Sequence, residues 1–184
     1  MLKILYKEDY YHSKINDEIC EKSFNFVEKT KNSYKEQSWN CKIRTSFNIT
    51  DNILNCIELH DLKLNILSHI ENFMHLKNSF YNGYIFNSWI NIYEKDFYQE
   101  EHTHSDEYKK YLSGIVYLTH NNSNLNLKSK HKSNLQTNIK PKFADIIIFD
   151  DDCPHSVSPN LNDNLRISLA FNYLFVSKWN GMFF

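Results

Sequence analysis

Residues 144–176 read ADIIIFDDDCPHSVSPNLNDNLRISLAFNYLFV, and the fold is decided in this stretch. Its first run contains three consecutive isoleucines, as expected for a strand that is covered on both faces. Its last run, residues 166–176, is long and apolar and has the composition of a second strand. The stretch therefore predicts two strands, with His155 after the turn between them and an Arg-x-Ser motif, Arg166 and Ser168, opening the second strand.

Much of the second half of the chain has this same strand-and-turn character. Further strand-like runs cover residues 83–93, 99–104 and 111–119. The Asn-, Ser- and Lys-rich segment 121–142 is either a loop or a hairpin. Short strands separated by turns indicate a sandwich or a barrel, so we predict one of these over the second half of the chain.

The first 80 residues predict two helices and one strand. Residues 16–29 carry apolar side chains among charges, which suits a short amphipathic helix. Residues 39–49 alternate apolar and polar side chains, and that period of two indicates a half-buried strand. A second helix with a buried apolar stripe is expected to begin near Asp61 and to end near Lys77. We therefore expect a mainly β protein with N-terminal helices packed on its sheet.

The bulk composition narrows the class of protein. A chain of 184 residues is long enough for one domain with a buried core. Its formal net charge is −1, so no general attraction to nucleic acid or to an anionic membrane is expected. No apolar run approaches the roughly 18 residues of a transmembrane helix. The four cysteines form no Cys-x-x-Cys pair and no secretory signal is visible, so we expect a reduced, cytoplasmic protein.

Three histidines predict a metal site. His102 and His104 lie two residues apart at the end of a strand-like run, so their side chains leave the strand on the same side. His155, from a distant strand, can supply a third contact to the same ion. Neutral imidazoles suit iron, zinc, copper and nickel. Because Arg166 can hold a carboxylate ligand beside such an ion, the combination points to a non-haem iron oxygenase.

The order and spacing of these pieces resemble the 2-oxoglutarate- and Fe(II)-dependent oxygenases, and within them the small phage and bacterial oxygenases related to prolyl hydroxylases. The pieces are SWINIY at 88–93, YQEEHTH at 98–104, LSGIVYL at 112–118, DIIIF at 145–149, Pro-His at 154–155 and Arg-Ile-Ser at 166–168. The resemblance implies a double-stranded β-helix (jelly-roll) core over residues 83–176, supported by residues 1–82. It also implies a single oxygenase domain over residues 1–184 and a phage- or bacteria-like origin.

The resemblance assigns iron ligands with one departure from the family pattern. His102 matches the first iron ligand and His155 the distal one, and both are expected to be catalytic. The usual triad has a carboxylate two residues after the first histidine, where this chain has His104. Three arrangements stay open: His104 is the third ligand, Asp106 or Glu107 supplies a carboxylate, or the protein gives only two ligands. We favour the three-histidine site.

The resemblance also implies residues for the cosubstrate. Arg166 matches the arginine that pairs with the distal carboxylate of 2-oxoglutarate, and Ser168 matches a serine that assists it. Tyr117 matches a tyrosine that reaches the cosubstrate from a neighbouring strand, and Tyr93 one that lines the pocket. Fe(II) and 2-oxoglutarate are therefore the expected cofactor and cosubstrate.

The implied function is a 2-oxoglutarate-dependent dioxygenase, a hydroxylase acting on a small molecule or a peptide. One alternative is a non-catalytic, cupin-like jelly-roll that binds a metal or another ligand. A second is a three-histidine iron dioxygenase that does not use 2-oxoglutarate. Arg166 and Ser168 count against both, since neither needs an arginine at that place. The sequence leaves open whether the chain forms a homodimer.

Overall fold

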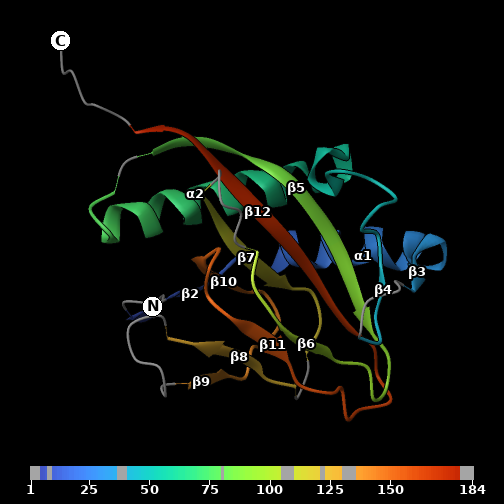
Figure 1. The fold of residues 1–184 in the computed structure, drawn as a ribbon. Coiled ribbons are helices and arrows are strands. Elements are labelled where there is room, and N and C mark those ends of the chain that lie inside the picture. Colours follow the sequence, from blue (N-terminus) through green and yellow to red (C-terminus); the bar gives the residue numbers. More distant parts are fainter. Residues whose placement is uncertain are drawn as a thin grey trace.

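The computed structural model describes residues 5–7, 10–36, 41–79, 81–104, 110–120, 123–129 and 136–178. Within them the chain forms two antiparallel β-sheets and two α-helices (Figure 1). The larger sheet has the order β1 (Leu5–Lys7), β2 (Tyr10–Lys14), β10 (Asp145–Asp150), β7 (Tyr111–Tyr117), β12 (Arg166–Lys178), β5 (Tyr81–Tyr93), β4 (Arg44–Thr45) and β3 (Lys35–Glu36). The smaller sheet has the order β6 (Gln99–His102), β11 (His155–Val157), β8 (Leu125–Lys128) and β9 (Gln136–Ile139).

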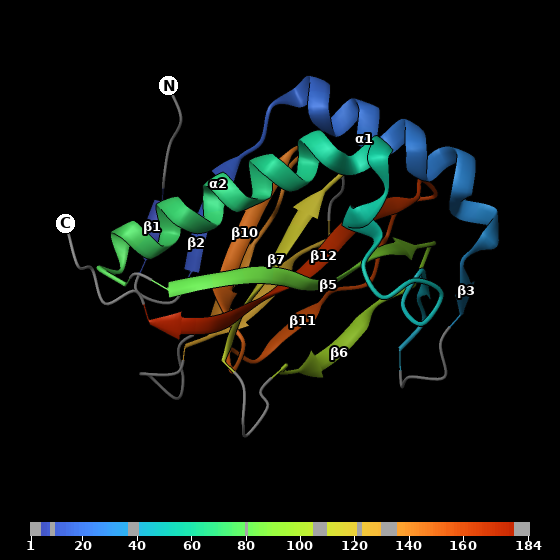
Figure 2. The ribbon, with the colours of Figure 1, turned by 90° about the horizontal axis from the view of Figure 1, so that it is seen from above.

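The two helices cover one face of the larger sheet, and the smaller sheet lies across its other face (Figure 2). They are α1 (Asp17–Thr30) and α2 (His60–Leu76), with short 3-10 turns η1 (Lys31–Ser33), η2 (Ile53–Asn55) and η3 (Ile57–Leu59). Asn16 caps α1 because its side chain accepts from the Glu18 N–H. Asp61 lies in the first turn of α2 and is not its cap.

The strand β12 shows how one sequence serves both faces of the larger sheet. Its odd-numbered residues enter the apolar core shared with the helices, and they are Ile167, Leu169, Phe171 and Tyr173. Its even-numbered residues line cavities on the side of the smaller sheet, and they are Arg166, Ser168, Ala170 and Asn172. Because successive side chains of a strand point to opposite faces, the apolar half of β12 anchors the sheet while the polar half builds a site.

The jelly-roll fold predicted from the sequence is confirmed. Antiparallel strands occupy the second half of the chain, and the two N-terminal helices support them. Within segment 121–142 the described strands β8 and β9 pair antiparallel, as its hairpin alternative predicted. The N-terminal strands β1 and β2 extend the larger sheet beyond the predicted core.

The strand predicted at residues 39–49 is wrong in length, and Trp39 lies outside the described residues. Among residues 41–49, which the structure describes, only Arg44–Thr45 is strand. The Thr45 hydroxyl donates to the Ile90 carbonyl and accepts from the Phe47 N–H, which turns the chain out of the sheet. Asn48 follows with a φ of 65°, a left-handed conformation that no strand contains.

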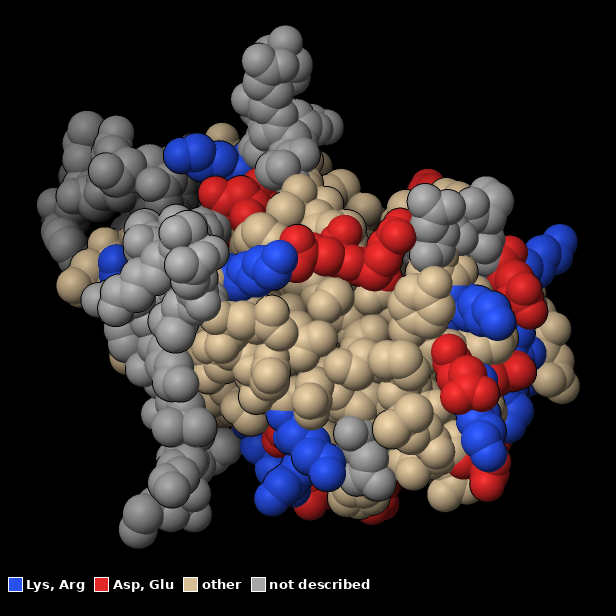
Figure 3. Space-filling view, turned by 60° about the horizontal axis from the view of Figure 1, so that its bottom comes forward, with Lys and Arg blue, Asp and Glu red and all other residues tan. Residues whose placement is uncertain are grey.

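The surface gives two further findings. In the view of Figure 3 the centre of the face carries uncharged residues, and Lys and Arg alternate with Asp and Glu around it. Among the described residues, no helix combines the length and the apolar character that crossing a membrane requires.

The packing of α2 on the sheet predicts a contrast between two of its residues. Ile66 is fully buried in the core against the larger sheet, whereas Leu64 is 52% exposed. Ile66→Ala is expected to lower the free energy of unfolding by about 2–5 kcal/mol because it leaves a cavity. Leu64→Ala is the control and is expected to change it by no more than about 0.5 kcal/mol. Urea titration measures both, and equal losses would contradict this packing.

Candidate active site

The structure brings three histidines together between the two sheets. His102 ends β6 and His155 begins β11, and the two are direct partners in the antiparallel pairing of these strands. His104 follows two residues after β6, and its main-chain N–H donates to the Asp151 carbonyl at 2.9 Å. One ring nitrogen from each histidine lies within 4.8 Å of the others. The predicted cluster therefore exists, and its role as a set of ligands stays a prediction.

Each of the three imidazoles is held at Nδ1 by an oxygen. For His102 it is the Glu100 carbonyl at 2.9 Å, and for His155 the Cys153 carbonyl at 3.0 Å. For His104 it is Oδ1 of Asn172 at 2.9 Å. These oxygens accept hydrogen bonds, so Nδ1 carries the proton in each ring and Nε2 has a lone pair to offer a metal.

Burial keeps the three rings neutral. It lowers the pKa of His102, lowers the pKa of His104 to about 4, and lowers the pKa of His155 well below 6.5. Phe149 packs against the His155 ring with the centroids 4.7 Å apart. Only neutral imidazole binds a metal. Since the three rings are already neutral at neutral pH, metal binding there requires no loss of a proton.

Gln99 links the histidine cluster to Tyr93. Its side-chain amide nitrogen lies 3.3 Å from Nε2 of His102, and its oxygen accepts from the Tyr93 hydroxyl at 2.9 Å. The amide therefore donates to the lone pair of His102 that a metal would use. An ion bound at His102 takes the place of this hydrogen bond.

A buried arginine lies beside the cluster without an acceptor. Arg166 is 1% exposed, and its Nε and both terminal nitrogens have no hydrogen-bond partner within the described part of the chain. Its guanidinium carbon lies 4.7 Å from the ring centroid of Tyr93 and 5.4 Å from that of Tyr117. Burial raises the pKa of Tyr117 to about 12, so its hydroxyl stays a donor. Arg166, Tyr93 and Tyr117, three of the four residues predicted for the cosubstrate, are therefore in contact.

Ser168 joins them through the strand register. It pairs with Asn91 on β5 and with Tyr117 on β7, and it is 2% exposed. A narrow inner chamber is lined by Arg166, Ser168 and Tyr93 and also by all three histidines. The predicted metal residues and three of the predicted cosubstrate residues therefore face one chamber, with Tyr117 beside its arginine.

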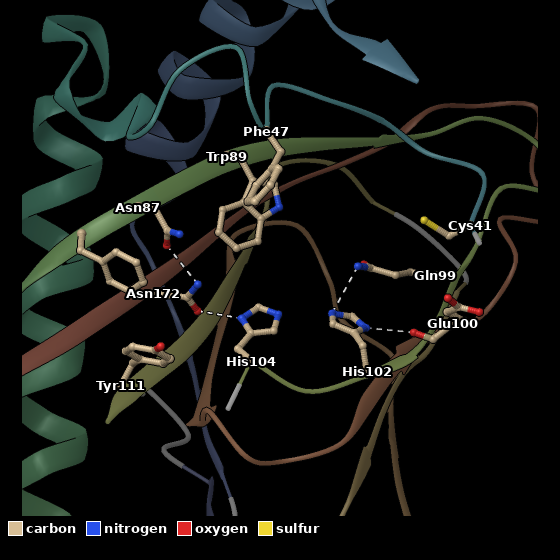
Figure 4. Close-up of a pocket in the computed structure, with 11 residues that line it drawn as sticks. Cys41, Phe47, Asn87, Trp89, Gln99, Glu100, His102, His104, Tyr111 and Asn172 are labelled. Atoms are coloured by element: carbon tan, nitrogen blue, oxygen red, sulfur yellow. Dashed lines mark hydrogen bonds between the residues drawn. The ribbon is translucent and has the colours of Figure 1, made fainter. Parts of the chain in front are cut away.

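A larger outer cavity of about 610 Å³ opens over His102 and His104 (Figure 4). These two histidines line both spaces, so the outer cavity and the inner chamber are adjacent. Its aromatic walls are Phe47, Phe86, Trp89 and Tyr111. Phe47 meets Trp89 edge-on at 5.2 Å between centroids, and Phe86 lies 5.2 Å from Tyr111. A pocket of this size with aromatic walls suits a small molecule or one side chain of a peptide.

Sequence reasoning missed the polar residues that hold the site. Gln99, Asn87, Asn172 and Ser113 were not predicted, although each faces the histidines or their partners. A period-two reading from Arg166 through Ser168 reaches Asn172 and could have found it. The carboxylates considered as alternative ligands, Asp106 and Glu107, lie outside the described residues.

Neither a protein-family model nor a curated protein sequence matches the chain, whereas many solved structures do. A prolyl-4-hydroxylase from Pseudomonas putida aligns with a TM-score of 0.71 at 10% identity, over 92% of this chain and 94% of that one. This chain has the fold of the 2-oxoglutarate- and Fe(II)-dependent oxygenases.

Two further oxygenase structures align over most of the chain. The epimerase SnoN of nogalamycin biosynthesis, solved with Fe³⁺, α-ketoglutarate and nogalamycin RO, aligns with a TM-score of 0.72 at 11% identity, over 92% of this chain and 80% of that one. A prolyl hydroxylase from Trichoplax adhaerens, in complex with a peptide of hypoxia inducible factor, aligns with a TM-score of 0.68 at 14% identity. The alignment covers 92% of this chain and 84% of that one. At these identities the alignments establish the oxygenase fold.

The residues present fit the iron and the cosubstrate that this oxygenase fold implies. Three neutral imidazoles, each with a lone pair on Nε2, are suitable donors for divalent iron once the Gln99 amide gives up its contact with His102. The unpartnered guanidinium of Arg166 is suited to a carboxylate at the end of the same chamber.

The three-histidine cluster predicts that His104 is needed for metal binding. His104→Ala is expected to weaken Mn(II) binding by more than the roughly 10- to 100-fold that loss of a residue behind a ligand costs. Calorimetric titration of the purified protein with Mn(II) measures this. His60→Ala is the control, since His60 is exposed at the start of α2. Unchanged affinity in His104→Ala would show that His104 is not a ligand.

Proposed function

We propose that this protein is a 2-oxoglutarate- and Fe(II)-dependent dioxygenase, and that it hydroxylates its substrate. The observation that carries the proposal is the buried, unpartnered guanidinium of Arg166 in the same chamber as the three histidines. A buried charge without a partner is unfavourable, so the chamber favours an anionic ligand beside Arg166. A dicarboxylic keto acid would offer one carboxylate to Arg166 and its keto-acid group to the metal.

In this proposal His102, His104 and His155 hold the iron through their Nε2 atoms, leaving the remaining positions of the metal open. Iron bound there would supply a dioxygen-dependent oxidation, in which 2-oxoglutarate loses carbon dioxide and takes one oxygen atom to become succinate while the substrate takes the other. The main-chain carbonyls of Glu100 and Cys153 hold two of the three rings in place.

Arg166 binds the distal carboxylate through two parallel N–H donors, a geometry that only arginine offers. The Ser168 hydroxyl and the Tyr117 hydroxyl supply further donors from neighbouring strands. The rings of Tyr93 and Tyr117 cover the guanidinium and exclude water from it. Exclusion of water strengthens the ion pair, because charges interact more strongly in a medium of low dielectric constant.

Two rival functions account less well for this chamber. A cupin-like binding protein without turnover accounts for the histidines, but it does not explain why an unpartnered guanidinium is buried beside them. A three-histidine iron dioxygenase that does not use 2-oxoglutarate has the same difficulty. Arg166 therefore favours the 2-oxoglutarate-dependent enzyme over both.

The outer cavity is proposed as the substrate site, because His102 and His104 line it. Prolyl hydroxylases and SnoN share the fold, and so a small molecule and a peptide are both compatible with it. The formal net charge of −1 favours a substrate other than nucleic acid. A single domain, a cytoplasmic location and a homodimer stay predictions.

Removal of the arginine tests the proposal. Arg166→Ala is expected to weaken 2-oxoglutarate binding to the Mn(II)-loaded protein by roughly 30-fold or more, while Mn(II) affinity stays nearly unchanged. Anaerobic calorimetry measures both affinities. Arg44→Ala is the matched control, since Arg44 is the other arginine of the chain and pairs with Glu94 outside the chamber. Equal 2-oxoglutarate affinity in Arg166→Ala and the unchanged protein would favour the binding-protein alternative.

A further inference from the structure

Three polar side chains form one row across the inner face of the larger sheet. Asn172 on β12 is the register partner of Asn87 on β5 and of Ser113 on β7. Asn172 is 5% exposed and Ser113 is 1% exposed. Buried amide and hydroxyl groups are unfavourable unless they are hydrogen-bonded. We call Asn87, Asn172 and Ser113 the polar row, and its partner beyond the sheet is His104.

The hydrogen bonds of the polar row fix which end of the Asn172 amide faces His104. His104 Nδ1 is hydrogen-bonded to Asn172 Oδ1 at 2.9 Å (Figure 4) and also lies 3.2 Å from Ser113 Oγ. The Ser113 hydroxyl donates to the same Oδ1 at 2.7 Å. On the far side, Asn172 Nδ2 donates to Asn87 Oδ1 at 3.0 Å. Because the amide nitrogen of Asn172 is directed at Asn87, its oxygen faces the imidazole, and His104 must carry its proton on Nδ1.

We propose that Asn172 is a positioning residue that makes His104 a metal ligand, with Ser113 and Asn87 fixing the orientation of its amide. The inference rests on the metal site of the proposed function. His102 and His155 are held at Nδ1 by main-chain carbonyls close to them in sequence. His104 is held by a side chain from a distant strand instead, so its orientation depends on the polar row.

The polar row fits a histidine at position 104 and does not fit a carboxylate. A carboxylate oxygen would face the Asn172 oxygen, and two acceptors form no hydrogen bond. The Ser113 hydroxyl would have to turn from Asn172 toward the carboxylate, and the amides of Asn172 and Asn87 would both have to reverse to donate to it. The His-x-His sequence and the polar row are therefore two parts of one arrangement.

A double-mutant cycle tests whether Asn172 acts through His104. Asn172→Leu is expected to weaken Co(II) and Mn(II) binding about 10- to 100-fold, the usual range for a residue that orients a ligand. In the His104→Ala background, Asn172→Leu is expected to have no further effect on metal affinity. Calorimetry gives the four affinities. The ligand-field spectrum of the Co(II)-loaded protein gives an independent readout, in which Asn172→Leu shifts toward His104→Ala.

Asn172→Asp is the second variant, since it keeps the size of the side chain and can only accept from His104. Metal affinity close to that of the unchanged protein is expected, because a carboxylate also holds imidazole with the proton on Nδ1, and the half-buried Asn87 amide can turn its nitrogen toward the second oxygen. Reversed amides in the polar row would instead place the proton on Nε2, facing the metal, and Asn172→Asp would then bind metal differently from the unchanged protein. An affinity as weak as that of Asn172→Leu would overturn the proposal.

Other outcomes separate this proposal from the function proposed above. Equal loss of affinity from Asn172→Leu in both backgrounds would show that Asn172 acts on the fold and would overturn it. Unchanged Co(II) affinity in Asn172→Leu would do the same. If the cycle behaves as expected but the unchanged protein binds no 2-oxoglutarate, the positioning role of Asn172 stands and the dioxygenase function fails.

Discussion

The guanidinium of Arg166 is buried between two strands with no acceptor among the described residues, and the rest of the site depends on this constraint. Its contacts with the Tyr93 and Tyr117 rings contribute about 0.5–2 kcal/mol each, whereas burial of an ion costs several kcal/mol. The aromatic contacts alone therefore do not offset its burial. A negatively charged ligand that pairs with Arg166 offsets the cost of burying its charge. Because the histidine cluster lines the same chamber, such a ligand also lies beside the proposed metal site.

The two long strands β5 and β12 allow the fold to carry such an unfavourable charge. They pair along almost their whole length, and their other face packs into the apolar core with α1 and α2. Burying one large apolar side chain contributes about 1.5–3 kcal/mol, and β12 alone supplies Ile167, Leu169 and Phe171. The same pairing sets Arg166 opposite Tyr93 and Asn172 opposite Asn87, so one register positions both ends of the site.

The sequence predicted the residues whose chemistry is visible in one strand and missed those whose role needs a neighbour. His102, His104 and His155 could be found because a His-x-His pattern is followed by a distant Pro-His and an Arg-x-Ser motif in one chain. Asn172 is an ordinary strand residue until the pairing with β7 and β5 brings Ser113 and Asn87 beside it. The prediction of a strand over residues 39–49 was too long for a related reason. The alternation of apolar and polar residues continues past Thr45, but the hydrogen bond from the Phe47 N–H to the Thr45 hydroxyl turns the chain there.

Anaerobic visible absorption spectroscopy tests the central claim most directly. When a 2-keto acid chelates Fe(II) at the histidine cluster, a charge-transfer band arises that neither component gives alone. We expect this band when 2-oxoglutarate is added to the Fe(II)-loaded protein, and we expect a higher 2-oxoglutarate concentration to be needed after Arg166→Ala. No band in the unchanged protein at saturating 2-oxoglutarate would contradict the account, because the histidines and Arg166 would then not share one ligand.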